Sequence, residues 1–287
     1  MREDDGKRGK KKILVALDAS QHSHSALEAA ISLADQLQAD LEGLFVEDAV
    51  VCRLTESRMT QEIGIFSATR RTLDGQELSR QLQGQVGRIR RLFRITTEQA
   101  GLRCRFRKTR GRVAQEVLSA AEGADVVILG KGAWAAVETG QLSPEVREAL
   151  LNLRASVLIL KAGSRLKEPL CVVYDGSPLA DKALLTAADV AGEYQGEITL
   201  LLVADGLEQG QAIRDQAETL LEGEDLSLHY RRLPEANLTW LVNFLRREGY
   251  QLLILPVLPA VREKEELMDF LDQVSIPVLL FQNPERV

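Results

Sequence analysis

The sequence contains few residues that could form cross-links or hold a metal. Its three cysteines, Cys52, Cys104 and Cys171, show no close pairing and no metal-ligand spacing. We therefore expect free thiols that fill small apolar spaces. His22 and His24 lie two residues apart, so they do not share a helix face and do not make a metal site by themselves. We predict no metal centre.

Long apolar runs are also missing. No window approaches the roughly 18 continuous apolar residues that a membrane helix needs. The opening stretch MREDDGKRGKKK has no apolar core of the signal-peptide type. We expect a cytoplasmic protein that uses no membrane and whose residues 1–11 form a flexible tail. Aromatic residues make up only 5% of the chain, which leaves few surfaces for stacking bases, so we expect no nucleic-acid partner.

Motifs of common nucleotide-dependent and hydrolytic enzymes do not occur. The chain has no Gly-x-x-x-x-Gly-Lys-Ser/Thr loop, and Ala135 stands where a Gly-x-Gly-x-x-Gly motif would need its third glycine. No nucleophile elbow is present. We therefore assign no catalytic residues and expect a protein that is not an enzyme.

The chain does show a regular alternation of apolar runs and amphipathic stretches. The runs are KILVALD, LEGLFVED, LRCRFRK, ADVVILG and ASVLILK in the first half, and PLCVVYD, EITLLLVAD, LSLHYRR, YQLLILP and IPVLLFQ in the second. Strands that alternate with helices predict βαβ units and a parallel sheet. We expect an α/β protein with two duplicated five-stranded domains, flanked by helices.

The two halves also align with each other without a gap near their starts. Residues 13–34 lie over residues 170–191, which places Asp18 on Asp175. This match indicates a duplication. We place the first domain at residues 12–163 and the second at residues 164–287, with a short polar joint between them.

The first half carries an insert around residues 47–78 that the second half lacks. An irregular stretch of this size in a compact domain is usually a functional loop, a lid or a disordered segment. The sequence does not decide among these three possibilities.

Three strand ends of the first half could border one ligand crevice. Asp18 ends the first strand, Val46 lies near the end of the second, and Gly130 ends the fourth. In an open parallel sheet, ligands bind beyond the carboxyl ends of strands where the strand order reverses. A carboxylate could accept from a ribose or an adenine, the backbone near Val46 could read an adenine edge, and glycines allow a phosphate to approach amide hydrogens.

These residues resemble the universal stress protein family. The resemblance rests on Asp18-Ala19-Ser20 and Asp175-Gly176-Ser177, each before an alanine-rich helix, and on the glycine loop after the fourth strand. The resemblance extends over nearly the whole chain, once in each half, and leaves out only the tail and most of the insert. It implies strand order 3-2-1-4-5 in each domain and pairing of the domains through their fifth strands. It also implies a role in stress responses and, as in many members, binding of ATP or AMP without rapid turnover.

The glycine loop departs from the spacing of the ATP-binding members. Those members have Gly-x-x-Gly, nine residues, then Gly followed by Ser or Thr, whereas Ala133 stands here at the second glycine position. The loop keeps four candidate residues at shifted spacing. Together with Asp18 and Val46, they make up the predicted nucleotide site: Gly130, Gly132, Gly140 and Ser143. Any Mg²⁺ would arrive with the nucleotide.

Two large side chains of this loop have alternative interpretations. Lys131 could meet a phosphate, but we expect it to be solvated. Trp134 could stack on a base, but we expect it to cover the apolar end of the sheet.

The second half lacks the loop. Pro256 occupies the position of Gly130 and has no amide hydrogen, and no glycine follows Tyr250. We interpret Asp175 and Ser177 as a tight turn and a helix N-cap. The second domain is therefore expected to be degenerate.

Charge is distributed unevenly. Residues 1–164 carry net +4 and residues 165–287 carry net −10, while residues 88–112 hold ten basic residues and one acid, Glu98. One interpretation is that LRCRFRK forms an edge strand, whose outward arginines prevent it from pairing with another chain. The alternative is a patch for an anionic partner, which could be nucleic acid, an acidic protein surface or the second domain itself.

The sequence predicts a tandem universal stress protein, a regulatory or interaction protein whose first domain binds an adenine nucleotide, with an unknown protein partner. A nucleotide-independent interaction scaffold and a slow ATPase are the alternatives. Either a monomer or a homodimer of tandem chains is compatible with the internal repeat.

Overall fold

The structure is a computed structural model that describes most of the chain. The described residues are 10–18, 20–56, 61–63, 70–72, 75–135, 140–166, 169–192, 196–233, 237–257 and 264–282. Residues 1–9 of the expected tail and parts of the insert lie outside this set, as does Ala19.

Twelve strands are found among the described residues. They are β1 (Lys12–Leu17), β2 (Asp40–Asp48), β3 (Gln61–Ile63), β4 (Arg70–Thr72), β5 (Cys104–Gly111), β6 (Val126–Gly130), β7 (Ser156–Leu160), β8 (Leu170–Tyr174), β9 (Glu197–Leu202), β10 (Ser227–Arg232), β11 (Leu252–Pro256) and β12 (Val278–Phe281).

The helices separate these strands in the chain. They are α1 (Gln21–Gln36), α2 (Ala49–Glu56), α3 (Gly75–Gln99), α4 (Val113–Ala120), α5 (Pro144–Asn152), α6 (Pro178–Ala191), α7 (Leu207–Leu220), α8 (Leu238–Glu248) and α9 (Lys264–Gln273).

Ten strands form one sheet in the order β10-β9-β8-β11-β12-β7-β6-β1-β2-β5. Each half contributes five parallel strands whose order, counted along its own sequence, is 3-2-1-4-5. The two fifth strands, β7 and β12, pair antiparallel, with Leu158 opposite Leu279. The predicted fold class, strand order and pairing of the halves are therefore confirmed.

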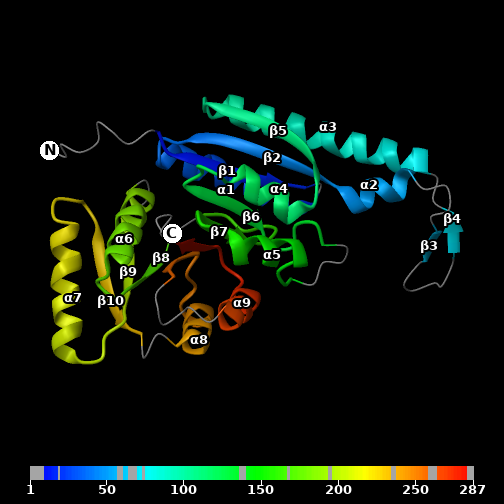
Figure 1. The fold of residues 1–287 in the computed structure, drawn as a ribbon. Coiled ribbons are helices and arrows are strands. Elements are labelled where there is room, and N and C mark those ends of the chain that lie inside the picture. Colours follow the sequence, from blue (N-terminus) through cyan, green and yellow to red (C-terminus); the bar gives the residue numbers. More distant parts are fainter. Residues whose placement is uncertain are drawn as a thin grey trace.

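Helices cover both faces of this sheet (Figure 1). On one face, α1, α3, α6 and α7 bury their apolar sides in a single core. On the other face, α4, α5, α8 and α9 do the same. The central strands β6, β7, β8 and β11 are buried along their whole length, because both of their faces carry helices.

The insert region of the first half forms α2, a two-stranded hairpin of β3 and β4, and the start of α3 among its described residues. Farther along, α3 packs closely on β2 at Gly43. A Cβ placed on Gly43 would lie 2.5 Å from Cε2 of Phe93, so only glycine admits this ring. Phe93 in turn meets Phe106 of β5, with ring centroids 5.5 Å apart.

Strand β5 is an edge strand, as the family resemblance implied.

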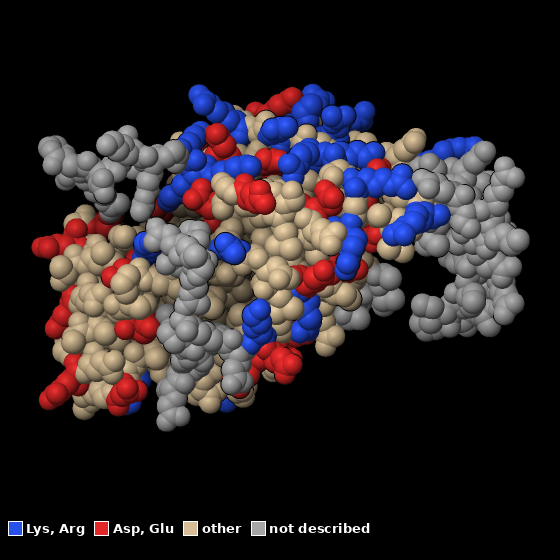
Figure 2. Space-filling view, in the orientation of Figure 1, with Lys and Arg blue, Asp and Glu red and all other residues tan. Residues whose placement is uncertain are grey.

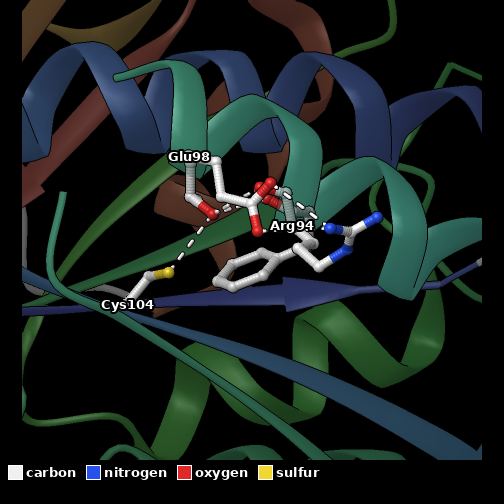
Figure 3. Close-up of polar contacts among 5 residues, drawn as sticks. Arg94, Glu98 and Cys104 are labelled. Atoms are coloured by element: carbon white, nitrogen blue, oxygen red, sulfur yellow. Dashed lines mark hydrogen bonds and ion pairs between the residues drawn. The ribbon is translucent and has the colours of Figure 1, made fainter. Parts of the chain in front are cut away.

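The three cysteines were expected to fill small apolar spaces. Cys52 and Cys171 are buried, but Cys104 at the start of β5 is exposed, so the expectation is wrong for Cys104. The Cys104 thiol donates to Oγ1 of Thr97 over 3.2 Å, which links the start of β5 to the last turns of α3 (Figure 3).

None of the helices among the described residues is long and apolar enough to cross a membrane. Within the same residues, no group of three or more His, Cys, Asp and Glu side chains is placed to hold a metal ion.

Candidate functional site

The structure brings three of the predicted site residues to one edge of the sheet. Leu17 pairs with Phe45, so the next residues, Asp18 and Val46, lie at the same carboxyl edge. Gly130 ends β6, the neighbour of β1 on its other side. The strand order reverses at β1, which is where an open parallel sheet offers a crevice.

The Asp18 carboxylate is buried, and groups of the chain itself occupy both of its oxygens. Oδ1 accepts from the main-chain N–H of Ser20 at 3.0 Å, from the Ser20 hydroxyl, and from the Ser23 hydroxyl at 2.7 Å. Oδ2 accepts from the main-chain N–H of Trp134 at 2.6 Å. Asp18 therefore ties the end of β1 to the loop after β6.

His22 fills the space above the two glycines of the loop. A Cβ on Gly130 would lie 2.6 Å from Cβ of His22, and a Cβ on Gly132 would lie 2.7 Å from its Nε2. The imidazole is only 4% exposed, and its Nδ1 accepts from the main-chain N–H of Ala162 at 3.1 Å. The glycines thus give room to a side chain of α1.

Lys131, between these glycines, reaches the second half of the chain. Its Nζ donates to the carbonyl oxygen of Asp272 at 2.8 Å and to that of Val274 at 3.0 Å. These carbonyls stand at the C-terminal end of α9, where a cation also meets the negative end of the helix dipole. Lys131 is 4% exposed, so the prediction that it is solvated is wrong.

Burial lowers the pKa of Lys131. Desolvation lowers the pKa of its ammonium group to about 8, Asp272 opposes this shift, and Lys161 adds to it. A cavity of about 10 Å³, with room for about one water molecule, lies beside it between β7 and the end of α9.

The side chain of Asp272 holds the far part of the same loop. Its Oδ1 accepts from the main-chain N–H of Leu142 at 2.7 Å, and its Oδ2 accepts from Arg147 of α5 at 2.6 Å. With Lys131, these contacts make the loop after β6 a junction between the two halves.

The last two predicted residues have local roles. Ser143 is the N-cap of α5: its Oγ accepts from the main-chain N–H of Val146 at 3.2 Å, and its own N–H donates to the Lys131 carbonyl at 3.0 Å. Gly140 has a φ of +73° and, within the described part of the chain, no atom within 4 Å of a Cβ placed on it. It is a turn glycine.

The corresponding edge of the second half has the predicted turn and cap. Ser177 donates its N–H to Oδ1 of Asp175 at 2.9 Å, and its hydroxyl accepts from the N–H of Ala180 at 3.2 Å. Pro256 ends β11 at the position of Gly130. Tyr174 is fully buried beside this turn and donates to Oδ1 of Asp181 at 2.6 Å.

Groups of the chain itself already contact most of the predicted nucleotide-binding residues. His22 lies against Gly130 and Gly132, both oxygens of the Asp18 carboxylate accept hydrogen bonds from the chain, and Ser143 is the N-cap of α5. Trp134 packs against the apolar core at the end of the sheet, the role expected of it, with a φ of +61° that few residues other than glycine adopt. Residues 136–139 lie outside the described residues.

Sequence reasoning did not find His22 or Asp272. A signal for His22 was present: His22, Ala26, Ala30 and Leu33 are spaced on one helix face, and all four are buried. Asp272 had no comparable signal, because its partners lie more than 120 residues away in the chain.

Comparison with known proteins gives two kinds of match. The universal stress protein family matches residues 168–239 in sequence. None of the curated proteins matches the chain. Solved structures match it over nearly its whole length, at identities that establish the fold alone.

Three of these solved structures match the chain over nearly its whole length. A universal stress protein from Archaeoglobus fulgidus DSM 4304 has a TM-score of 0.65 and 15% identity, covering 96% of this chain and 97% of that one. A protein of unknown function from Pseudomonas aeruginosa PAO1 has a TM-score of 0.56 and 13% identity, covering 96% and 94%. A protein from P. aeruginosa UCBPP-PA14, named for the same family, has a TM-score of 0.55 and 14% identity, again covering 96% and 94%.

The resemblance inferred from the sequence is therefore confirmed. Residues 168–239 match the universal stress protein family, and both halves of the chain carry that family's fold in tandem.

Proposed function

We propose that this chain is a nucleotide-independent interaction protein of the universal stress protein fold. The observation that carries the proposal is the position of His22 above Gly130 and Gly132. A phosphate that approached these glycines from the side of α1 would have to displace the imidazole and break its hydrogen bond to Ala162.

Two further features support the proposal. The Asp18 carboxylate already accepts hydrogen bonds at both oxygens from Trp134 and the two serines, so it has a structural role without any ligand. Lys131 donates to the end of α9 and is not directed at the crevice. The loop that serves nucleotides in many members of this family is used here to join the two halves.

The test is a nucleotide titration against thermal stability. A ligand at 100 times its dissociation constant stabilises a protein by about 2.7 kcal/mol. We expect neither ATP nor AMP, with or without Mg²⁺, to shift the unfolding temperature of the wild-type chain at millimolar concentration, and no nucleotide to be released when the purified protein is denatured.

The variant His22→Ala makes this test sharper. It removes the side chain above the two glycines and leaves the loop sequence intact, and His24→Ala, at an exposed position in the same helical turn, is the matched control. A stabilisation by ATP that appears only in His22→Ala would support the proposal. Stabilisation of the wild type by ATP, lost in Asp18→Ala, would establish the nucleotide-binding alternative instead.

On the same grounds, we expect the protein to bind a partner and not to hydrolyse ATP. Phosphate release from ATP should equal that of a buffer blank, with and without Mg²⁺. Release above the blank that is lost in Asp18→Ala would favour a slow ATPase.

A further inference from the structure

One end of the molecule carries an exposed basic surface. Arg88, Arg91 and Ile95 lie on one stripe of α3, three and four residues apart, and Ile95 is 42% exposed. Arg103, just before β5, and Arg105 on it are also exposed. We call these five residues the basic end.

The arginines of the basic end are not neutralised within the described part of the chain, although neighbouring cations are. Arg94 pairs with Glu98 at 3.3 Å on α3, as Figure 3 shows. Arg107 lies 3.5 Å from Glu42, and Lys108 lies 2.7 Å from Glu47. No such ion pair is found for the four arginines defined above, so their charge is available to a partner.

The surface of α3 is also shaped to admit side chains. A hollow of about 380 Å³ lies beside Gly84 and is lined by Arg80, Gln81, Gln85 and Arg88. Among the lining side chains, the guanidinium of Arg88 and the carboxamide of Gln85 offer N–H donors. Carboxylates are the complement of such a lining.

The opposite end of the molecule is acidic. Residues 205–225 contain seven acidic residues and one basic residue, Arg214. Asp215 and Glu218 lie on one exposed stripe of α7, and Glu222 is exposed in the turn that follows the helix. Leu207, at the start of the same helix, is 87% exposed. We call these four residues the acidic end; Arg214 partly offsets it by pairing with Glu218 at 2.9 Å.

The two ends do not meet within one chain. Strands β5 and β10 are the outermost strands of the ten-stranded sheet, and α3 and α7 cover the same face beside them, with α1 and α6 in between. Figure 2 shows the blue basic side chains gathered over α3 and β5 and red acidic side chains at the far side, over α7. The second domain of the same chain therefore cannot neutralise the basic end.

We propose that the basic end of one copy docks on the acidic end of a second copy, head to tail. Opposite charge brings the two surfaces together, and each offers one exposed aliphatic side chain, Ile95 or Leu207, for contact beside the charged groups. This inference goes beyond the proposed function and does not depend on whether a nucleotide binds.

The contact joins helix surfaces and does not extend the sheet. A pairing of β5 with β10 would place Arg105 and Arg107 near Arg231 and Arg232, so like charges would oppose it. The basic and acidic ends are different surfaces, so the contact is heterologous, and repeated contacts give open chains of copies.

Sedimentation velocity tests the proposal at about 0.01 M and about 1 M NaCl, where the Debye length is about 30 Å and about 3 Å. The wild type should show concentration-dependent association at low salt and sediment as a single 31.8 kDa species at high salt. Reversal of charge at one end, in Arg88→Glu/Arg91→Glu or in Asp215→Lys/Glu222→Lys, should raise the dissociation constant at low salt by about tenfold or more.

Mixing the two reversed variants gives the decisive measurement, because each now complements the other. The mixture should associate where neither variant associates alone. The control Arg154→Glu/Arg247→Glu changes net charge as much as the first variant at exposed positions away from both ends, and it should associate like the wild type.

Monomeric wild type at low salt, or association unaffected by either reversal, would overturn the proposal. Binding of duplex DNA tests the remaining alternative, which is that the basic end binds nucleic acid. If the wild type stays monomeric but binds duplex DNA with an affinity that falls steeply with salt and is lost in Arg88→Glu/Arg91→Glu, the basic end serves nucleic acid and not a second copy.

Discussion

The main-chain N–H of Trp134 donates to Oδ2 of Asp18 over 2.6 Å, and this hydrogen bond ties the loop after β6 to the end of β1. The other oxygen of the same carboxylate accepts from Ser20 and Ser23. An aspartate that could have read a ligand thus stabilises the edge of the sheet where a ligand would bind.

Replacement of Asp18 should therefore reduce stability without any ligand present. Asp18→Ala leaves the Trp134 N–H and the Ser23 hydroxyl without their buried acceptor, and each lost partner costs about 1 kcal/mol or more. We expect a loss of about 2–4 kcal/mol in the free energy of unfolding, measured by urea denaturation. Asp175→Ala is the matched control, because Asp175 accepts from Ser177 in a partly exposed turn and should cost less than about 1 kcal/mol. Equal losses at the two sites would contradict this account.

Because His22 lies so close to Gly130, a side chain at position 130 should reduce the stability of the protein. Gly130→Ala places a methyl group 2.6 Å from Cβ of His22, so the helix or the loop must move. We expect a destabilisation of about 1–3 kcal/mol, the usual effect of overpacking. In a His22→Ala background the methyl group still faces the Cβ, but the imidazole can no longer block a shift of α1, so the added cost of Gly130→Ala should be smaller.

The helix glycine Gly87 supplies the control for that experiment. No described atom lies within 4 Å of a Cβ placed there, and the residue is exposed in the interior of α3. Gly87→Ala should stabilise the chain by up to about 1 kcal/mol, because alanine favours a helix. If Gly130→Ala behaves like Gly87→Ala, or costs the same with and without His22, the tight contact is not what requires glycine at position 130.

The architecture could be predicted from the sequence because its signals are local and repeated. Apolar runs such as Val126–Gly130 and Leu252–Pro256 fix the strands, and the internal match of Asp18 with Asp175 fixes the duplication. The pairing of β7 with β12 across the halves is not local, and the family resemblance supplied the expectation that the fifth strands pair.

The role of the glycine loop could not be predicted in the same way. Glycine permits a close approach but does not say what approaches, and in this structure His22 lies against both Gly130 and Gly132. The sequence around Lys131 does not indicate that it is buried, because the residues that cover it, at the end of α9, lie about 140 residues away. Long-range contacts of this kind leave no pattern in a single sequence.

The link between the halves through Asp272 can be tested directly. Asp272→Ala removes the acceptor of the Leu142 N–H and the partner of Arg147. We expect a loss of about 2 kcal/mol in unfolding free energy and hydrogen exchange at the Leu142 amide that is faster by about tenfold or more. Asp269→Ala, one turn earlier on α9 and exposed, is the control and should change neither quantity. Unchanged exchange at Leu142 in Asp272→Ala would show that the loop does not depend on the second half.

The lowered pKa of Lys131 predicts how stability depends on pH. Its ammonium group has a pKa of about 8 in the folded chain against 10.5 ordinarily, because it is buried. Between these values the unfolded chain binds the proton and the folded chain does not, so this group makes stability rise with pH from about 8 to about 10.5, by about 3 kcal/mol in total. Urea unfolding of the wild type and of Lys131→Met across this range should give a difference that grows with pH in favour of the wild type. Lys182→Met, which replaces an exposed lysine of α6, should show no such trend, and a flat difference for Lys131→Met would mean that Lys131 is charged and solvated after all.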